Sequence, residues 1–490
     1  ELTCADGGTL YLRAGEHLVF EIMLTESLGI RLGGTSGTPA GFDPLPLWDD
    51  AGRPNHTLVA AHATLARQTV NIADAYQVEA FDFTGTRAFD AKTGYRSKSF
   101  LTVPMINHQQ QVIGVLQLIN ARPGGDGGFD PEGAVPFSGE DQELVESLAS
   151  QAAVALTNQR LLDDQRRLFE AFIELIAGAI DDKSPYTGGH CRRVPELTMM
   201  LAEAAAATGE GPLADFSMSD EDRYELQIAG WLHDCGKITT PEYVVDKATK
   251  LETIHDRIHE VAARFAVLRC EAEARMLRDV RGGADPEARA AELEAELRRL
   301  DRDLALLRRC NIGGEVMADA DVALVQAIAR RRWRAADGEE RPLLSEDEVR
   351  NLTVRKGTLT PAERAVINDH IVATIKMLEA LPFPPHLARV PEYAGGHHER
   401  MDGRGYPRGL TREQMSVQAR VMGIADVFEA LTAKDRPYKP GMKLSRALAI
   451  LEGMKRDNHV DPDLLDVFVR EKVYLRYAHA FLDPDQIDCD

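Results

Sequence analysis

Residues 395–410 read GGHHERMDGRGYPRGL, and residues 230–238 read GWLHDCGKI. The first stretch holds two adjacent histidines, and the second holds the adjacent pair His233 and Asp234. Neighbouring side chains on a helix point about 100° apart, so one pair cannot easily chelate a single ion. The pair can instead place the imidazole on one cation and the carboxylate between two cations. The two stretches therefore predict a centre that holds two metal ions, in a part of the chain whose apolar residues repeat at helical spacing.

Two further stretches add imidazole, carboxylate and basic groups. TGGHCRRV places His190 at the start of a predicted helix, and GIADVFEALTAKDRPYK contains Asp426. Arg436 and Lys439 follow Asp426 in the same stretch and supply local positive charge. The chain as a whole is acidic, so an anionic substrate has to be met by a local basic cluster of this kind.

Together these stretches resemble the HD-GYP family of cyclic di-GMP phosphodiesterases, with HD at His233-Asp234 and GYP at Gly405-Tyr406-Pro407. The resemblance implies an all-α domain over residues 167–490 that hydrolyses cyclic di-GMP to pGpG and further to GMP. Related cyclic dinucleotides such as 3′,3′-cGAMP are alternative substrates, because nothing in the motifs separates guanine from adenine. By this resemblance, the metal ligands are His190, His233, Asp234, His370, His397, His398 and Asp426.

One of these ligands has to be chosen among three histidines. Family members carry it at the end of a helix that follows a Lys-Pro-Gly-Lys-Leu-Thr stretch, which is divided in this chain. DKATKLETIHDRIHE offers His255 and His259, whereas RKGTLTPAERAVINDH keeps the spacing from Leu-Thr to histidine and ends at His370. We expect His370 to be the ligand, and the other two to lie on a helical hairpin away from the metal.

The resemblance also indicates the number and kind of cations. A trinuclear variant of the family carries a glutamate four residues before the first histidine, where this chain has Tyr186. Without that carboxylate a third cation has fewer ligands. We therefore expect two divalent cations, and water, phosphate or Asp182 would have to complete a third site. Imidazole and carboxylate ligands suit iron or manganese, and the resemblance favours non-haem iron.

The expected mechanism follows from charge. Two cations about 3.5–4 Å apart lower the pKa of a bridging water and polarise a phosphodiester for in-line attack. Asp234 would bridge the cations, and Lys237 would neutralise a phosphate oxygen or assist the leaving group. Arg436 and Lys439 would hold the second phosphate, and Tyr406 would border the pocket. Structural alternatives stay open, because Lys237 can pair with a carboxylate, and Arg436 and Lys439 can be surface charges.

Two other functions stay open at the level of the sequence. Nucleotide phosphohydrolases of the wider HD superfamily share the His-Asp pair, but they do not explain the DGRGYP segment. A catalytically silent receptor would bind a dinucleotide, or only partner proteins, and would signal through its helices. Such a receptor is expected to lack a metal ligand, and none of the core set is missing from this sequence. We expect the glycines Gly403 and Gly405 to provide positive-φ turns in either case.

The first third of the chain, from Thr9 to about Asn120, has short β-rich runs, one helical stretch and loops rich in Gly, Asp and Pro. SFLTVPMIN and QVIGVLQLIN, separated by HQQ, predict a β-hairpin in an antiparallel sheet. With GGTLYL, TGYRSKSFLTVPM, GVLQLINA and FSGEDQELVESLASQAAVALTN they resemble a GAF domain over residues 1–160. The resemblance implies an α+β sensor that binds an unidentified small ligand, or a module that dimerises without one.

A long helix is predicted to connect the two halves over residues 140–180. Ser138 and Asp141 form its capping-box-like start, and the helical pattern continues without proline. Its apolar residues recur at three- and four-residue steps, so this stripe pairs with its copy in a homodimer or packs against the chain's own domains. The stripe comprises Leu144, Leu148, Ala152, Ala155, Leu162, Phe169, Phe172, Ile173 and Ile176.

Residues 252–355 interrupt the C-terminal half with a second repeat. Asp285 and Pro286 are the N-cap and first residue of a helix that follows the breaker RGGADP. We expect two antiparallel helices that pack along a heptad seam, with the flanking Glu and Arg runs as a solvated face. The seam is formed by Ile254, Ile258, Val261, Phe265, Leu268 and Ala272 on one helix, and by Leu293, Leu297, Leu300, Leu304 and Leu307 on the other.

Composition narrows the classes of protein further. The 490 residues include 57 Lys and Arg against 78 Asp and Glu, a net charge of −21 that disfavours binding to duplex nucleic acid or an anionic membrane. The six cysteines form no CxxC pair, and no apolar run approaches the ~20 residues of a membrane span. We therefore expect a cytoplasmic bacterial protein with free thiols. Because the sequence starts at Glu1 inside a predicted strand, we also expect a segment upstream of it.

Overall fold

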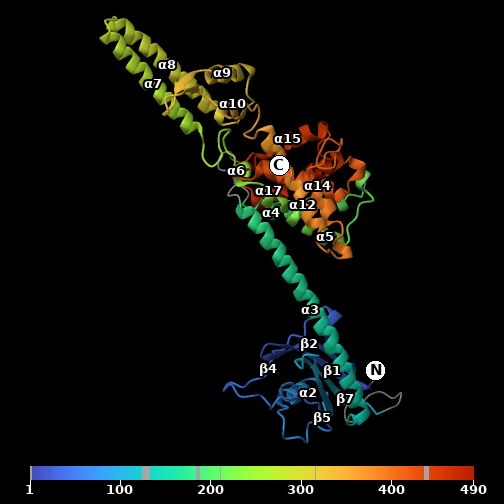
Figure 1. Ribbon diagram of the computed structural model, residues 1–490. Coiled ribbons are helices and arrows are strands. Elements are labelled where there is room, and N and C mark those ends of the chain that lie inside the picture. The colour runs from blue at the N-terminus through green and yellow to red at the C-terminus, as the bar shows by residue number, and fades with distance from the viewer. Residues whose placement is uncertain are drawn as a thin grey trace. The chain divides into compact units, whose positions relative to one another are not determined.

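The computed structural model describes residues 3–123, 133–183, 188–209, 211–314, 316–434 and 441–489. The chain divides into two compact units, residues 1–169 and 170–490 (Figure 1). Among the described residues, no helix combines the length and the apolar character that a membrane crossing needs. The first unit is α+β and the second is almost entirely helical, as the sequence predicts.

The first unit is built on an antiparallel sheet whose hydrogen-bonded order is β3-β2-β1-β7-β6-β5, with β4 paired to β2. The predicted hairpin is confirmed, because β6 and β7 pair antiparallel with Phe100 opposite Ile119. The sheet order also places β1 beside β7, so the N-terminal strand lies in the centre of the sheet. The strands are β1 Ala5–Ala14, β2 His17–Thr25, β3 Ile30–Gly33, β4 Leu45–Pro46, β5 Val70–Ile72, β6 Phe100–Ile106 and β7 Val112–Ala121.

Alternating side chains of the central strands serve two different layers. Leu101, Val103 and Met105 of β6 are buried against Val145 and Ala149 of helix α3 (Gly139–Lys183). On the opposite face, side chains of β1 and β7 meet the helix α1 (Val59–Ala66), and the helix α2 (Thr84–Thr93) lies on the same side (Figure 1). The sheet is therefore covered by α3 on one face and by α1 and α2 on the other.

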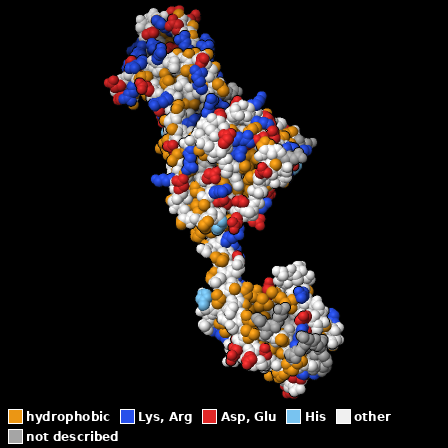
Figure 2. Space-filling view, turned by 90° about the vertical axis from the view of Figure 1, so that its right-hand side faces the viewer, with side chains coloured by type: hydrophobic (Ala, Val, Ile, Leu, Met, Phe, Trp, Pro, Cys, Tyr) orange, Lys and Arg blue, Asp and Glu red, His pale blue; other side chains and the backbone are white. Residues whose placement is uncertain are grey.

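Helix α3 begins where the capping box predicts, since the Asp141 backbone N–H donates to Ser138 Oγ at 3.1 Å. Its two ends pack into the units, but its middle carries apolar residues that are open to solvent. Leu161, Leu168 and Leu175 recur every seven residues and are 52%, 58% and 66% exposed. Hydrophobic side chains are visible along this stretch in Figure 2. These three leucines lie outside the predicted stripe. Within the stripe, Ile173 is buried but Leu162 and Phe172 are 60% and 55% exposed, so packing against the chain's own domains covers only part of it.

In the second unit, helices α4, α5, α12, α13 and α14 contact one another and surround the histidine-rich segments. Their core includes the fully buried side chains of Leu197, Leu201, Phe428 and Tyr477. Pro195 lies inside α4 and packs against Gly230 of α5. The helices are α4 His190–Ala206, α5 Asp220–Leu232, α6 Glu242–Val245, α11 Pro361–Asn368, α12 His370–Glu379, α13 Val390–Gly395, α14 Val417–Thr432, α15 Leu444–Arg456, α16 Pro462–Arg470 and α17 Val473–Phe481.

Within this unit, helices α7 (Ile258–Arg281) and α8 (Pro286–Asn311) form the predicted hairpin. Val261, Phe265, Leu300 and Leu307 are buried in its seam. The Asp285 side chain caps α8 by accepting a hydrogen bond from the Glu287 backbone. The spacing predicts that Ile254 belongs to the seam, and this prediction is wrong, because Ile254 precedes α7 and is 98% exposed.

The insert is larger than a hairpin. Helix α9 (Asp319–Ala329), strands β8 (Arg332–Arg334) and β9 (Glu340–Pro342), and helix α10 (Glu346–Leu352) follow α8. Val325, Ile328, Leu343 and Leu352 join the buried core of the hairpin. These short elements have too few residues to show a period of their own, so they form because they cover the apolar base of α7 and α8.

Candidate metal centre

The seven proposed ligands come from five different segments, four of them at or next to a helix end. His190 is the first residue of α4, and Asp426 lies within α14. His370 is the first residue of α12, and the adjacent histidines follow the end of α13. His233 caps the C-terminus of α5, a helix whose start is fixed by a capping box between Ser219 and Asp222. Four helix ends and the interior of α14 therefore direct the ligands to one place.

The structure gathers all seven side chains into two groups. In each group, the ligand atoms lie within 4.8 Å of one another. Six of the seven side chains are buried, and His398 is half-buried. The first group contains His190, His233, Asp234 and Asp426, and the second contains His370, His397 and His398.

Asp234 lies between the two groups. Its Oδ2 atom is 3.2 Å from His190 Nε2 and 3.2 Å from His233 Nε2. Its Oδ1 atom is 3.2 Å from His370 Nε2 and 3.9 Å from His397 Nε2. Each carboxylate oxygen thus faces the histidines of a different group, which is the arrangement of a carboxylate that bridges two cations.

Three of the imidazole rings are held by backbone carbonyl oxygens. The Nδ1 atoms of His233, His370 and His397 lie 2.6, 2.5 and 2.6 Å from the carbonyl oxygens of the residues three positions earlier. A protonated Nδ1 donates to each carbonyl, so Nε2 carries the lone pair and points into the centre. This is how proteins fix the tautomer and the orientation of metal-binding histidines.

Several buried polar atoms of the centre lack a hydrogen-bond partner among the described residues. They are the Nε2 atoms of His190, His233 and His397 and the Oδ1 atom of Asp234. Leaving such atoms unpaired inside a protein is costly, and each of them is a good ligand atom for a divalent cation. The donor set therefore fits two metal ions.

Electrostatics keep most of these groups in the form that binds a cation. Burial lowers the pKa of His397 well below its ordinary value and that of His398 to about 4, so both imidazoles are neutral at pH 7. Although burial opposes its ionisation, Asp234 has a pKa well below the usual range because of Lys237 and His233. The pKa of His190 is raised by surrounding carboxylates in spite of its burial, so a cation that binds there displaces a proton.

Lys237 and Tyr406 border a cavity of about 230 Å³ beside the ligands. The Lys237 Nζ atom lies 2.5 Å from Asp234 Oδ2, and Lys237 belongs to the short 3-10 helix Cys235–Thr239 that follows the His-Asp pair. The Tyr406 ring stacks on His398 with ring centroids 4.9 Å apart. Burial raises the pKa of Tyr406 to about 12, so the hydroxyl stays protonated and can donate.

The sequence missed a carboxylate that holds His190. Glu429 lies three residues after Asp426 on α14, so the two side chains share a face of the helix. One oxygen of Glu429 contacts His190 Nδ1, and the other accepts a hydrogen bond from Arg193 Nε at 2.7 Å. Its spacing from Asp426 was the available signal. Glu429 therefore fixes the orientation of the His190 ring, as the backbone carbonyl oxygens do for His233, His370 and His397.

Other positioning contacts reach the ligand-bearing segments from outside the motifs. The Asp181 carboxylate accepts hydrogen bonds from the backbone N–H groups of Gly189 and Cys191, on either side of His190. The Gly236 backbone N–H donates to Thr374 Oγ1 at 2.9 Å. A side chain has no room at Gly236, because an added Cβ would lie 1.9 Å from the carbonyl oxygen of His370. No local pattern in the sequence indicates these contacts.

The remaining predicted residues either fall outside the described part of the chain or belong to neither ligand group. Arg436, Lys439 and Tyr186 are outside the described residues. His255 and His259 belong to neither group, and His255 Nε2 instead lies 2.7 Å from Glu260 Oε1 on the insert. The prediction of positive φ holds for Gly403 (φ 74).

Positive φ is wrong for Gly405, which is needed for a different reason. A Cβ atom at this position would lie 2.4 Å from the Glu399 Cα and the Arg400 nitrogen. The glycine lets the Tyr406 segment pass close to the backbone that carries the paired histidines.

Comparisons with protein-family models support this division of the chain. Residues 1–156 match a model described as a GAF domain, and residues 187–321 and 347–464 match models described as HD domains. The chain thus combines an N-terminal GAF domain with an HD domain. An HD domain implies divalent metal binding, and the two ligand groups supply suitable donors.

The names of curated relatives include the substrates on which those proteins act. The 3′3′-cGAMP-specific phosphodiesterase 3 of Vibrio cholerae is 41% identical over 289 residues, which cover 58% of this chain and 36% of the relative. A probable cyclic di-GMP phosphodiesterase of the same organism is 35% identical over 144 residues, which cover 28% of this chain and 32% of the relative. The chain thus spans about a third of the length of these two relatives.

Among solved structures, a GAF domain resembles part of the chain. The GAF domain of an Acinetobacter phosphoenolpyruvate-protein phosphotransferase is 17% identical, with a TM-score of 0.22, over 33% of this chain and 75% of that chain.

Proposed function

We propose that this protein is a metal-dependent phosphodiesterase that hydrolyses cyclic di-GMP to pGpG and further to GMP. The observation that carries the proposal is Asp234, whose two oxygens face the histidines of two separate ligand groups. The alternative substrate 3′,3′-cGAMP is supported by the name of the relative that is 41% identical over 289 residues. A silent receptor is disfavoured, because all seven expected ligand side chains converge.

The chain's own residues would prepare the reaction in distinct ways. Two bound divalent cations, iron or manganese, would supply a hydroxide at neutral pH and polarise the phosphodiester. Asp234 would hold both ions, and the carbonyl-bound imidazoles would present Nε2 without having to reorient. Lys237, which already lies against Asp234, would donate to a phosphate oxygen or to the departing 3′ oxygen.

Substrate binding requires cationic and aromatic groups beside the metal centre. We assign this role to Lys237 and Tyr406, which line the cavity next to the ligands. Arg436 and Lys439 would hold the second phosphate, as their position after Asp426 in the sequence suggests. The stacked ring of Tyr406 would limit where a nucleotide base can enter.

The organisation of the whole chain is part of the proposal. Residues 1–160 would form the sensor, residues 140–180 the connecting helix, and residues 167–490 the phosphodiesterase with its insert at 252–355. A small ligand in the GAF domain would set the activity through α3, in a cytoplasmic protein. The exposed heptad Leu161, Leu168 and Leu175 favours a homodimer through α3, and a strictly monomeric mass in solution would contradict it.

The test combines metal analysis with turnover. We expect the double substitution His233→Ala and Asp234→Ala to remove most bound metal and all hydrolysis of cyclic di-GMP and 3′,3′-cGAMP. The matched control, His255→Ala with His259→Ala, removes two histidines that lie outside the ligand groups and should leave both unchanged.

Each result of this experiment has a definite meaning. Retained hydrolysis in the first variant would reject the assignment. Metal-loaded protein that binds a cyclic dinucleotide without cleaving it would favour the receptor, and the ratio of kcat/KM values identifies the substrate.

A further inference from the structure

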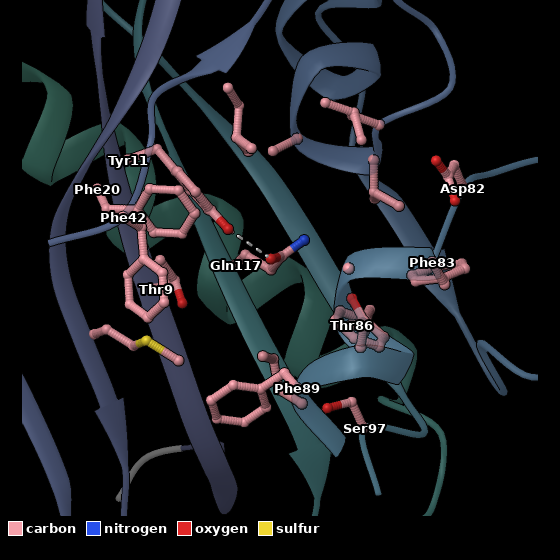
Figure 3. Close-up of a pocket in the computed structure, with 18 of the residues that line it drawn as sticks. Thr9, Tyr11, Phe20, Phe42, Asp82, Phe83, Thr86, Phe89, Ser97 and Gln117 are labelled. Carbon is pink, nitrogen blue, oxygen red and sulfur yellow. Dashed lines mark hydrogen bonds between the residues drawn. The ribbon is translucent and has the colours of Figure 1, made fainter. Parts of the chain in front are cut away.

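The first unit contains a cavity that is separate from the metal centre. Its volume is about 380 Å³, and it lies between the sheet and helices α1 and α2 (Figure 3). Strands β1, β2 and β7 line one side, and helix α2 supplies Thr86 and Phe89 on the other. This volume falls within the range of pockets that hold small molecules.

Aromatic rings dominate the walls. Tyr11, Phe20 and Phe42 form a chain of contacts, with ring centroids 4.7 and 5.1 Å apart. Across the cavity in Figure 3, Phe83 from the start of α2 also lines the wall, and its ring centroid is 5.3 Å from that of Phe100. Aromatic walls on both sides favour a flat ring between them, because offset stacking and edge contacts add to apolar burial.

The buried side-chain amide of Gln117 places hydrogen-bonding groups in the cavity wall. Gln117 projects from β7 in Figure 3, and its Oε1 accepts a hydrogen bond from the Tyr11 hydroxyl at 3.1 Å. Its Nε2 donates to Thr102 Oγ1 at 3.0 Å. A primary amide has two N–H groups and an oxygen with two lone pairs, so one of each can serve a ligand. The fixed amide can therefore orient the polar edge of a ring.

The charged side chains in the described lining of the cavity are both acidic. Asp43 and Asp82 line the cavity, and no Lys, Arg or His does so among the residues that the structure describes. A hydrogen bond from Thr84 holds the pKa of Asp82 below its ordinary value, so this carboxylate is ionised at neutral pH. Phosphate and carboxylate groups of a ligand would be repelled by these two exposed carboxylates, and Arg87, whose charge also lowers the pKa of Asp82, is not part of the lining.

We propose that this cavity binds an uncharged or cationic planar aromatic compound, oriented by Gln117 and held between the aromatic walls, and that it rejects nucleotides and other anions. The selectivity comes from Asp43 and Asp82 in a lining that has no Lys, Arg or His among the described residues. The proposal does not depend on phosphodiester hydrolysis, because every residue that carries it lies in the first unit.

Three probes with one ring system test the charge selection. Indole is uncharged, tryptamine is cationic and indole-3-acetate is anionic, and each is titrated calorimetrically into the full chain. We expect saturable 1:1 binding of indole and tryptamine, at least about tenfold tighter than that of indole-3-acetate, and no binding of cyclic GMP. Equal or tighter binding of either anion would overturn the proposal, and so would the absence of binding by both indole and tryptamine.

Two variants locate the binding. Thr86→Phe fills the cavity and should abolish binding, whereas the control Ala88→Phe places the same ring on an exposed position of α2 outside the lining and should not. The pair Asp43→Asn and Asp82→Asn should bring indole-3-acetate within about threefold of indole. Unchanged affinity in Thr86→Phe, or unchanged discrimination in the double Asn variant, would refute the assignment.

A third variant separates this inference from the proposed enzymatic function. The His233→Ala, Asp234→Ala double variant should bind indole and tryptamine as the parent protein does, since its substitutions lie in the second unit. Loss of ring binding in that variant would contradict an independent site. Loss of hydrolysis with binding retained is the expected outcome.

Discussion

Lys183, in the last turn of α3, is predicted to hold the segment that carries Lys237. Its Nζ atom donates to the carbonyl oxygens of Lys237, Ile238 and Thr240 at 3.1, 2.6 and 2.6 Å. An ammonium group has three N–H donors, so these carbonyls use all of them. Because the connecting helix ends here, Lys183 ties that helix directly to the turn after the His-Asp pair.

The substitution Lys183→Met keeps the aliphatic stem and removes the donors. Charge-assisted hydrogen bonds contribute about 1.5–3 kcal/mol each, but these are partly exposed, so we expect a local loss of about 2–3 kcal/mol in total. That loss raises the open fraction of residues 237–240 about 30- to 160-fold. Hydrogen exchange of the amides of these residues should accelerate by the same factor, and kcat should fall, because Lys237 is displaced in the open state.

The control and the readouts separate positioning from general destabilisation. Lys356→Met removes an exposed lysine of the same unit and should change neither exchange nor kcat. Metal content should stay at the parent level in Lys183→Met, because Lys183 contacts no member of either ligand group. Parent-like exchange at residues 237–240 together with full activity would show that the three hydrogen bonds do not position Lys237.

Two further predictions concern the ligand shell and the insert. Glu429→Gln should weaken metal retention about 10- to 100-fold in a chelator competition, because it weakens the hold on His190; the exposed Glu452→Gln should not. Against the effect of burial, hydrogen bonds from Arg264 and the Ser345 backbone hold the pKa of Glu348 below its ordinary value. The unfolded insert therefore binds the proton more readily, so its stability should fall as the pH drops below about 5. Arg264→Met should flatten that dependence in proteolysis of residues 252–355, and an unaltered pH profile would contradict the role of the pair.

Much of the architecture could be predicted because it depends on local patterns. The β6–β7 hairpin follows from two β-branched runs around a polar turn, and the α7–α8 hairpin follows from seven-residue spacing. The capping box at Ser138 and the N-cap at Asp285 can also be predicted directly from the sequence. Local patterns did not predict α9, β8, β9 and α10. These elements pack on the base of the insert hairpin and share its hydrophobic core.

The sequence by itself determined which residue types could form a metal centre, since adjacent His-Asp and His-His pairs and a tyrosine-bearing glycine loop are chemical features of the chain. Only the tertiary structure decided that the two oxygens of Asp234 face different histidine groups and that Glu429 meets His190. It also decided that aromatic side chains from distant strands enclose a cavity. The physical reason is that these contacts join residues up to 239 positions apart, and the packing of whole helices and sheets sets their distances.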